Sequence, residues 1–111
     1  MGGAASRRKG HNFERWVAGQ LRDLTGLKSI RRGWQARDGH DAPDVICPGF
    51  WIECKRCKQV NIHAAMEQAE RDADGRMMPV AVTKRDGGPV LVTMLWEDWV
   101  TIAREEMVED E

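Results

Sequence analysis

A tight-turn dipeptide, Pro48-Gly49, separates two short segments with strand character, residues 44–47 and 50–55. Proline followed by glycine favours a tight turn, so the pattern predicts two adjacent strands joined as a hairpin. Side chains alternate between the two faces of a strand, which places Phe50, Ile52 and Cys54 opposite Trp51, Glu53 and Lys55. Glu53 and Lys55 therefore share a face, with Cα atoms about 7 Å apart at the usual strand rise.

Hydrophobic periodicity predicts three helices and three further strands around this hairpin. The helices are expected at about 12–25, from 62 to near Gly75, and at 96–107, and the strands at 27–32, 79–84 and 90–94. Asn12 and Asn61 are expected to cap the first two helices. The order of helix, three strands, helix, two strands and helix predicts an α/β fold in which helices pack against one sheet.

The chain has 111 residues and a hydrophobic content of 41%, which suit one domain covering residues 1–111. No apolar segment approaches the roughly 20 residues that a membrane span requires. Residues 1–10 are basic and are not followed by the apolar segment of a signal peptide. We expect a soluble, cytoplasmic protein with a flexible basic arm at 1–11 and an acidic tail at 105–111.

Charge is distributed unevenly along the chain. Residues 1–60 contain 12 lysines and arginines against 6 acidic residues, whereas residues 104–111 contain one arginine against five acidic residues. Local potential, more than net charge, governs encounters with charged ligands. The basic front half is therefore compatible with a polyanionic partner, although a solvated surface of mixed charge would have the same composition.

The hairpin is expected to bring Asp44, at the start of its first strand, alongside Glu53 and Lys55 on the second. Carboxylates are the ligands that a hard cation such as Mg²⁺ prefers, and a lysine can stabilise the charge that develops during phosphodiester cleavage. Helical periodicity places Glu14 at the rim of the apolar face of the first helix, within reach of such a site. The alternative is that Glu53 and Lys55 form an exposed ion pair and that Asp44 forms a turn.

Pro43-Asp44 followed, after eight intervening residues, by Glu53-Cys54-Lys55 resembles the motif of the PD-(D/E)xK nuclease superfamily. The resemblance implies a restriction-endonuclease-like mixed sheet with an αβββαβ core, here extended by a strand and a C-terminal helix. It also implies a Mg²⁺-dependent endodeoxyribonuclease in which Mn²⁺ can replace Mg²⁺. Catalysis would then depend on Asp44, Glu53 and Lys55.

Within that superfamily the segment from Arg8 to Arg15 is similar to the basic, glycine-containing start of archaeal-type and phage Holliday junction resolvases. In those enzymes a glutamate on the first helix joins the metal site, so the resemblance assigns Glu14 to catalysis and metal binding with Asp44 and Glu53. Cutting two symmetric strands of branched DNA requires two active sites, which predicts a homodimer. An apolar surplus on the last helix, with Trp96, Trp99, Val100 and Met107, could supply the interface, as could Met77-Met78.

Eight cationic residues close to the proposed site in the sequence are candidates for phosphate contacts, which position DNA without reading its sequence. They are Arg7, Arg8, Lys9, Arg31, Arg32, Arg37, Arg56 and Lys58. Four tryptophans are candidates either for stacking on unpaired bases or for packing in a core or interface, namely Trp34, Trp51, Trp96 and Trp99. Trp34 is the better stacking candidate because its neighbours are polar and basic. Gln68 on the second helix is a further residue that could lie near the site.

Other functions stay open from the sequence. The same residues could belong to a nicking or restriction-type nuclease, or the fold could bind nucleic acid without cutting it. Cys54 and Cys57 form a CxxC pair which, with Cys47 and His63, raises the possibility of a zinc site. Strand alternation turns Cys54 away from Glu53 and the second pair of ligands typical of zinc modules is missing, so the carboxylate site is favoured.

Overall fold

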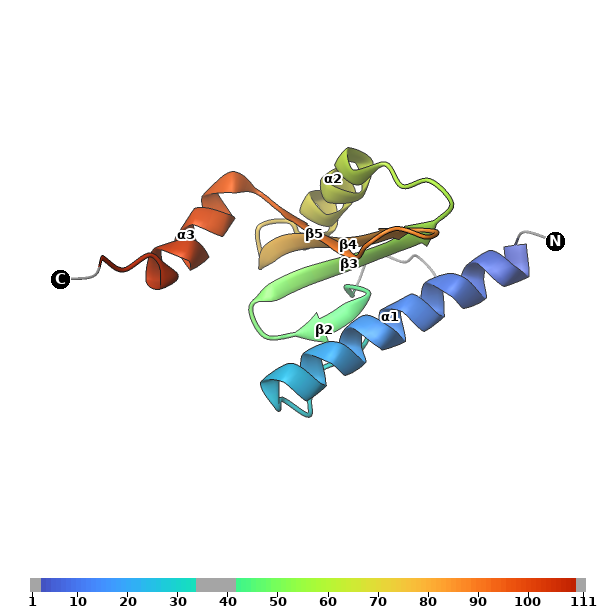
Figure 1. Ribbon diagram of the computed structural model, residues 1–111, viewed down its shortest axis with the longest axis horizontal. Helices are drawn as coiled ribbons and strands as arrows, with labels where there is room; N and C mark the ends of the chain where they lie inside the picture. The colour runs from blue at the N-terminus through green and yellow to red at the C-terminus, as the bar shows by residue number, and fades with distance from the viewer. Residues whose placement is uncertain (1–2, 34–41, 110–111) are drawn as a thin grey trace.

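The computed structural model of the protein describes residues 3–33 and 42–109. Three helices and five strands follow one another in the predicted order (Figure 1). Their bounds are α1 Gly3–Thr25, β1 Arg31–Arg32, β2 Val45–Cys47, β3 Phe50–Cys57, α2 Ile62–Ala73, β4 Met78–Arg85, β5 Leu91–Met94 and α3 Trp96–Glu106. The prediction of a mixed α/β fold is therefore confirmed. None of these helices is long and apolar enough to cross a membrane.

The strands form one sheet in the order β1-β2-β3-β4-β5. The β2 and β3 strands are the predicted hairpin, with Val45 paired to Ile52 and Cys47 paired to Phe50. By contrast β3 and β4 are parallel, and α2 makes the connection between them. A parallel pair requires such a crossover, which places the carboxyl ends of β3 and β4 next to each other.

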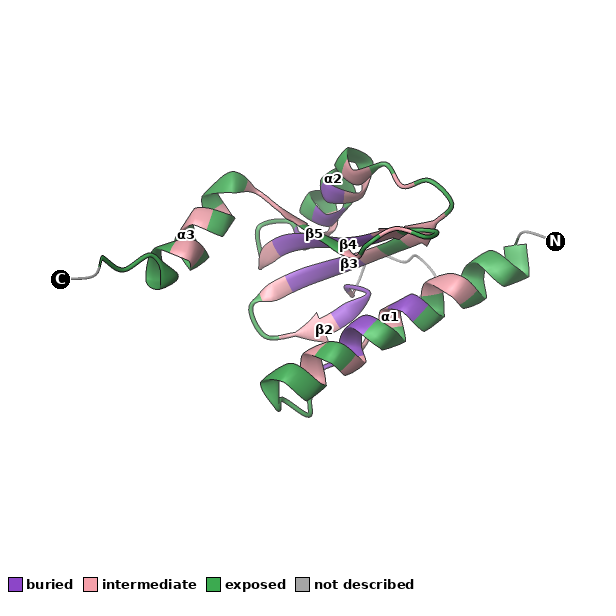
Figure 2. Ribbon diagram, in the orientation of Figure 1, coloured by how far each residue is buried: buried purple, intermediate pink, exposed green. Residues whose placement is uncertain are grey.

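Two helices cover opposite faces of the sheet, α1 on one side and α2 on the other (Figure 1). Phe13, Val17 and Ala18 of α1 pack with Ile52 and with the other buried apolar residues of that face, which are Ile30, Val45, Val80 and Val82. Met66, Ala69 and Ala73 are the buried residues of α2. In Figure 2 the buried positions accordingly run along β3 and β4 and the facing sides of these two helices.

The first helix begins earlier than predicted. Residues 3–11, expected to be a flexible arm, form the N-terminal turns of α1, so Asn12 lies inside the helix and does not cap it. Alanine, arginine and lysine at most of these positions have favourable helix propensity. The Lys9 ammonium group also donates to Asp86 at the turn between β4 and β5, at 2.9 Å, which fixes this part of α1 against the sheet.

The first predicted strand is shorter than expected. Instead of residues 27–32, only Arg31 and Arg32 pair with β2. Gly26 adopts a φ of 76° at the end of α1, and the Ile30 amide then donates to the Leu27 carbonyl, so residues 27–30 form a turn. Leu27 is apolar, which favours a strand, but the chain must reverse its direction there to return from α1 to the sheet.

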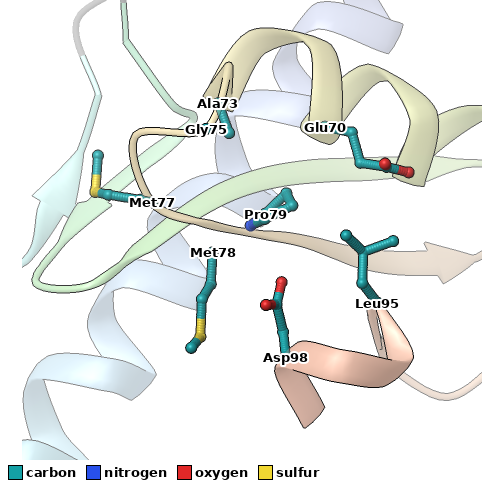
Figure 3. A pocket seen from close by; sticks show the side chains of 8 residues that line it. All are labelled: Glu70, Ala73, Gly75, Met77, Met78, Pro79, Leu95 and Asp98. Atoms are coloured by element: carbon teal, nitrogen blue, oxygen red, sulfur yellow. The ribbon is translucent and has the colours of Figure 1, made fainter. Parts of the chain in front are cut away.

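The last helix extends away from the sheet, at the opposite end from the N-terminal part of α1 (Figure 1). None of its residues, all of which the structure describes, is buried (Figure 2). A cavity of about 370 Å³ lies where α3 leaves the body of the protein, at the amino end of β4. Figure 3 shows Asp98 of α3 and Glu70 of α2 at this cavity, with Pro79 between them and Met78 beside Asp98. This end of the molecule is therefore apolar and acidic.

Candidate active site

The Asp44 carboxylate lies where the ladder between β2 and β3 ends. The Asp44 amide donates to the Ile52 carbonyl at 2.9 Å, and the Cys54 amide then donates to Asp44 Oδ2 at 2.8 Å. A side-chain oxygen thus takes the place of the next backbone acceptor, because β3 continues beyond the start of β2. The hairpin brings Asp44 beside the Glu53-Cys54-Lys55 segment, as predicted.

Glu53 is held by its neighbour on the same face of β3. The Trp51 indole N–H donates to Glu53 Oε1 at 2.9 Å, and the two residues are 1% and 8% exposed. The Arg76 guanidinium lies 4.5 Å from the centre of the Trp51 ring and donates to the Asp72 and Ala73 carbonyls at the end of α2. Trp51 is thereby buried, so its predicted alternative role in stacking on a base is wrong. The indole N–H of Trp51 instead orients the Glu53 carboxyl group.

The environment of Glu53 disfavours its charged form. Burial is the main cause, the negative charge of Asp44 adds to it, and together they raise the pKa of Glu53 to about 9 against the opposing effect of the Trp51 hydrogen bond. Hydrogen bonding with Asp44 and Asp72 raises it further. Two buried carboxyl groups side by side need a proton or a cation between them. The residues present thus fit a hard divalent cation, which would replace that proton.

Glu14 lies at the edge of the core, as its helical position predicted. It accepts a hydrogen bond from Arg32 Nε at 2.9 Å. Burial raises the pKa of Glu14, the hydrogen bond from Arg32 lowers it, and the charge of Asp44 raises it again. Burial and then the charges of Asp44, Glu14 and Glu53 also raise the pKa of the Cys54 thiol. The charges of all three predicted carboxylates thus act on Cys54 of β3.

Among residues 3–33 and 42–109, however, no three histidine, cysteine, aspartate or glutamate side chains are arranged to hold a metal ion. Asp44 and Glu53 are adjacent, whereas Glu14 is engaged by Arg32. A cation at the Asp44–Glu53 pair would therefore gain Glu14 as a third ligand only if the Glu14 side chain moved toward the pair, and the contact with Arg32 uses one of its two carboxylate oxygens.

An open cleft of about 480 Å³ gives access to this pair. Asp44, Glu53 and Lys55 line one side of it, and the other lining residues are Cys54, Cys57, Gln59, Asn61, Ala64, Ala65 and Gln68. Asn61 caps α2, as predicted, by accepting the Ala64 amide at 3.0 Å. Gln68 faces the cleft from α2. Asp72, one helical turn further along α2, was not anticipated from the sequence, although its spacing of four residues from Gln68 places the two on one face.

The cations expected to contact DNA have different surroundings. Arg7, Arg8, Arg31 and Lys58 are exposed. Lys9 and Arg56 both face Asp86, at 2.9 Å and 3.8 Å, and Arg32 is paired with Glu14. Arg37 and Trp34 lie outside the described residues. The structure thus brings Lys9, Arg56 and Lys58 together near the carboxyl end of β3, and assigns Arg32 to the carboxylate site itself.

The cysteines do not form the alternative zinc site. Cys54 and Cys57 lie three positions apart on β3 and therefore project from opposite faces of the sheet. Cys54 packs against the core on the α1 side. The Cys57 thiol donates to the Gln59 carbonyl at 2.8 Å, and the Cys47 thiol to the Phe50 carbonyl at 3.8 Å. One ion could not bind both thiolates of the CxxC pair in this strand.

Comparison with known proteins agrees with this geometry. Residues 5–109 match the family described as phage putative PDDEXK endonuclease. No curated protein and no solved structure matches the chain. The match includes all three carboxylates and Lys55, and the five-stranded mixed sheet between α1 and α2 is the restriction-endonuclease-like arrangement that the motif implied. The protein belongs to the phage PDDEXK endonuclease family, and so to the PD-(D/E)xK nuclease superfamily.

Proposed function

We propose that this protein is a divalent-metal-dependent DNA endonuclease that hydrolyses phosphodiester bonds in branched DNA. The observation that carries the proposal is the Asp44–Glu53 pair, in which burial and then the charge of Asp44 raise the pKa of Glu53, at the edge of an open cleft that also contains Lys55. Family membership supports nuclease activity, and the likeness of residues 8–15 to junction resolvases supports a branched substrate.

Asp44 and Glu53 would hold Mg²⁺ or Mn²⁺, with Glu14 as the candidate third ligand. Such an ion supplies Lewis-acid stabilisation of a phosphoryl oxygen and lowers the pKa of a bound water. Trp51 fixes one oxygen of Glu53, and the Cys54 amide fixes one oxygen of Asp44, so neither carboxylate needs to reorganise on binding the ion. The exposed Lys55 ammonium group stands at the rim of the cleft, where it can stabilise negative charge on the phosphate being cleaved.

A cleavage assay tests the proposal. We expect the protein to cut a four-way DNA junction in Mg²⁺ or Mn²⁺, to cut a linear duplex of the same arm sequence more slowly, and to cut neither in excess chelator. Binding without metal-dependent cleavage would contradict the endonuclease and support a binding module. Equal cleavage of both DNAs would remove the preference for branches and support a nicking or restriction-type nuclease.

We also propose that the active form is a homodimer. Trp96 and Trp99 are stacked on each other with ring centres 5.5 Å apart, and Trp96 is 72% exposed. They adjoin β5, which lies at an edge of the sheet, and they line one hollow together with Val92 and Met94 of that strand. A contiguous apolar surface of this kind supports an interface between two copies.

Light scattering at micromolar concentration is expected to give the mass of a dimer. Trp96→Glu together with Trp99→Glu should give a folded monomer, because charge would be buried in the interface. Leu24→Glu together with Leu27→Glu is the matched control, since it places the same two charges at exposed apolar residues at the end of α1 and in the turn that follows it. A monomeric wild-type protein, or a double variant that remains dimeric, would contradict this interface.

A further inference from the structure

A second groove continues the cleft beyond the carboxyl ends of β3 and β4. It has a volume of about 640 Å³ and lies between the β3–α2 connection and the turn between β4 and β5. Its lining residues are Lys58, Gln59, Val60, Arg85, Asp86 and Gly87. Gln59 also lines the cleft that contains Asp44 and Glu53, so the two hollows adjoin. Figure 1 shows the β3–α2 connection and the turn between β4 and β5 side by side, at the same end of the molecule as the N-terminus of α1.

The groove and its rim gather positive charge from three separate parts of the chain. The parallel register pairs Arg56 with Lys84 and Cys57 with Arg85, and strand alternation places the first pair on the α1 side of the sheet and Arg85 on the side of the cleft. Lys58 follows β3, and Lys9 arrives from α1. Against these five cations the described residues of this groove and its contacts supply one carboxylate, Asp86. Like charges opposed on neighbouring strands are unfavourable unless an anion lies between them.

Asp86 neutralises only part of this positive charge. It accepts two hydrogen bonds from Lys9, at 2.9 and 3.2 Å, and its contact with Arg56 is longer, at 3.8 Å. The Lys9 hydrogen bond first, and then the charges of Lys9, Arg56 and Lys84, lower the pKa of Asp86. The Arg56 Nε atom is buried and has no hydrogen-bond partner within the described structure. Asp86 is thus engaged by Lys9 and Arg56, and the cations that an anion in the groove would contact are Lys58 and Arg85.

The turn also directs Arg85 toward the groove. The Asp86 amide donates to the Cys57 carbonyl at 3.1 Å, and the Gly88 amide donates to the Arg85 carbonyl at 2.9 Å. A Cβ at Gly88 would come within 2.6 Å of Arg85 Cγ, so the glycine makes room for the arginine stem. Arg85 is paired in register with Cys57, which lines the cleft, so the Arg85 side chain projects from the cleft side of the sheet and lines the groove.

We infer that this groove binds the phosphate backbone of the DNA strand next to the scissile phosphate, with Lys58 and Arg85 as its phosphate contacts. The inference rests on the proposed endonuclease function and adds the path by which DNA leaves the cleft. The opposite end of the sheet, where Glu70 and Asp98 line the cavity of Figure 3, would repel a polyanion. Lys84 and Arg85 were absent from the cations predicted from the sequence.

The test is DNA binding in chelator, so that no cleavage occurs, over a series of salt concentrations. Lys58→Ala with Arg85→Ala is expected to weaken binding several-fold and to lower the slope of log affinity against log salt by about 2, one for each phosphate contact. Phosphate-ethylation interference should disappear on one side of the cleavage position. Lys28→Ala with Arg104→Ala is the control, since it removes the same charge from exposed residues elsewhere and should alter neither measurement.

The outcomes separate the groove from the function on which it rests. If the wild-type protein binds and cuts DNA but the double variant keeps its affinity, salt slope and interference pattern, the groove assignment is wrong and the endonuclease stands. Equal losses in the double variant and in the control would also overturn the assignment, because net charge would then explain them. If the wild-type protein neither binds nor cuts DNA, both proposals fail. Circular dichroism should show all variants folded, since the four replaced residues are exposed.

Discussion

Replacing Glu53 by glutamine is expected to reduce metal-dependent cleavage by at least about 100-fold, because it removes an anionic ligand of a hard cation while keeping the shape of the side chain. Asp44→Asn should have the same effect, and its side-chain oxygen can still accept the Cys54 amide. DNA binding in chelator should change little in either variant. Cleavage near the wild-type rate in Mg²⁺ would contradict the assignment of this carboxylate pair.

Glu53→Gln should also raise the stability of the metal-free protein at pH 8. Burial and the Asp44 charge raise the pKa of Glu53 from 4.5 to about 9, so between these pH values the folded protein binds a proton that the unfolded chain loses. The free energy of unfolding therefore falls as the pH rises through this range. Glu53→Gln cannot lose that proton, and its melting temperature in chelator should exceed that of the wild type at pH 8.

Addition of Mg²⁺ or Mn²⁺ at pH 8 should then raise the melting temperature of the wild-type protein, because a ligand that binds only the folded state stabilises it. The Glu53→Gln protein should respond much less. Calorimetric titration with Mn²⁺ measures the same interaction without DNA. A variant that binds Mn²⁺ as tightly as the wild type would show that the ion binds elsewhere, whatever the effect on cleavage.

Replacing Lys55 by alanine is expected to lower the rate of cleavage at saturating DNA by at least about 100-fold, which is the usual effect of removing one group that stabilises charge in the transition state. Its effect on affinity should be several-fold at most, because one exposed lysine contributes little to the overall attraction of DNA. Single-turnover cleavage and equilibrium binding, measured on the same DNA, separate the two effects.

Lys58→Ala offers the matched comparison for Lys55, since both lysines are exposed and lie three residues apart near the end of β3. We expect the opposite pattern there, a loss of affinity with a cleavage rate near that of the wild type once DNA is saturating. If Lys55→Ala lowers affinity and rate in equal proportion, Lys55 belongs to the basic surface and has no special role at the reacting phosphate.

Local sequence patterns were sufficient to predict the hairpin and its chemistry. Pro48-Gly49 sets the turn, and strand alternation then determines that Glu53 and Lys55 share a face. These relations involve neighbouring residues or a short turn, so they do not depend on the rest of the fold. Helical periodicity placed Glu14 at the edge of the core in the same way. The order of helices and strands followed from such patterns, which is why it was predicted nearly in full.

Tertiary structure decided which partner each of these side chains meets. Glu14 binds Arg32, 18 positions away, and Lys9 binds Asp86, 77 positions away, contacts that no local pattern encodes. The sequence did not determine whether Trp51 faces solvent or the interior. Its burial depends on α2 and on Arg76, which lies over the Trp51 ring. The parallel pairing of β3 with β4 brought Arg85 beside Cys57 and so created the basic groove. The sequence alone thus determined which groups can perform the chemistry, because strand and helix geometry is local, whereas their burial, charge and neighbours depended on segments that meet only when the chain packs.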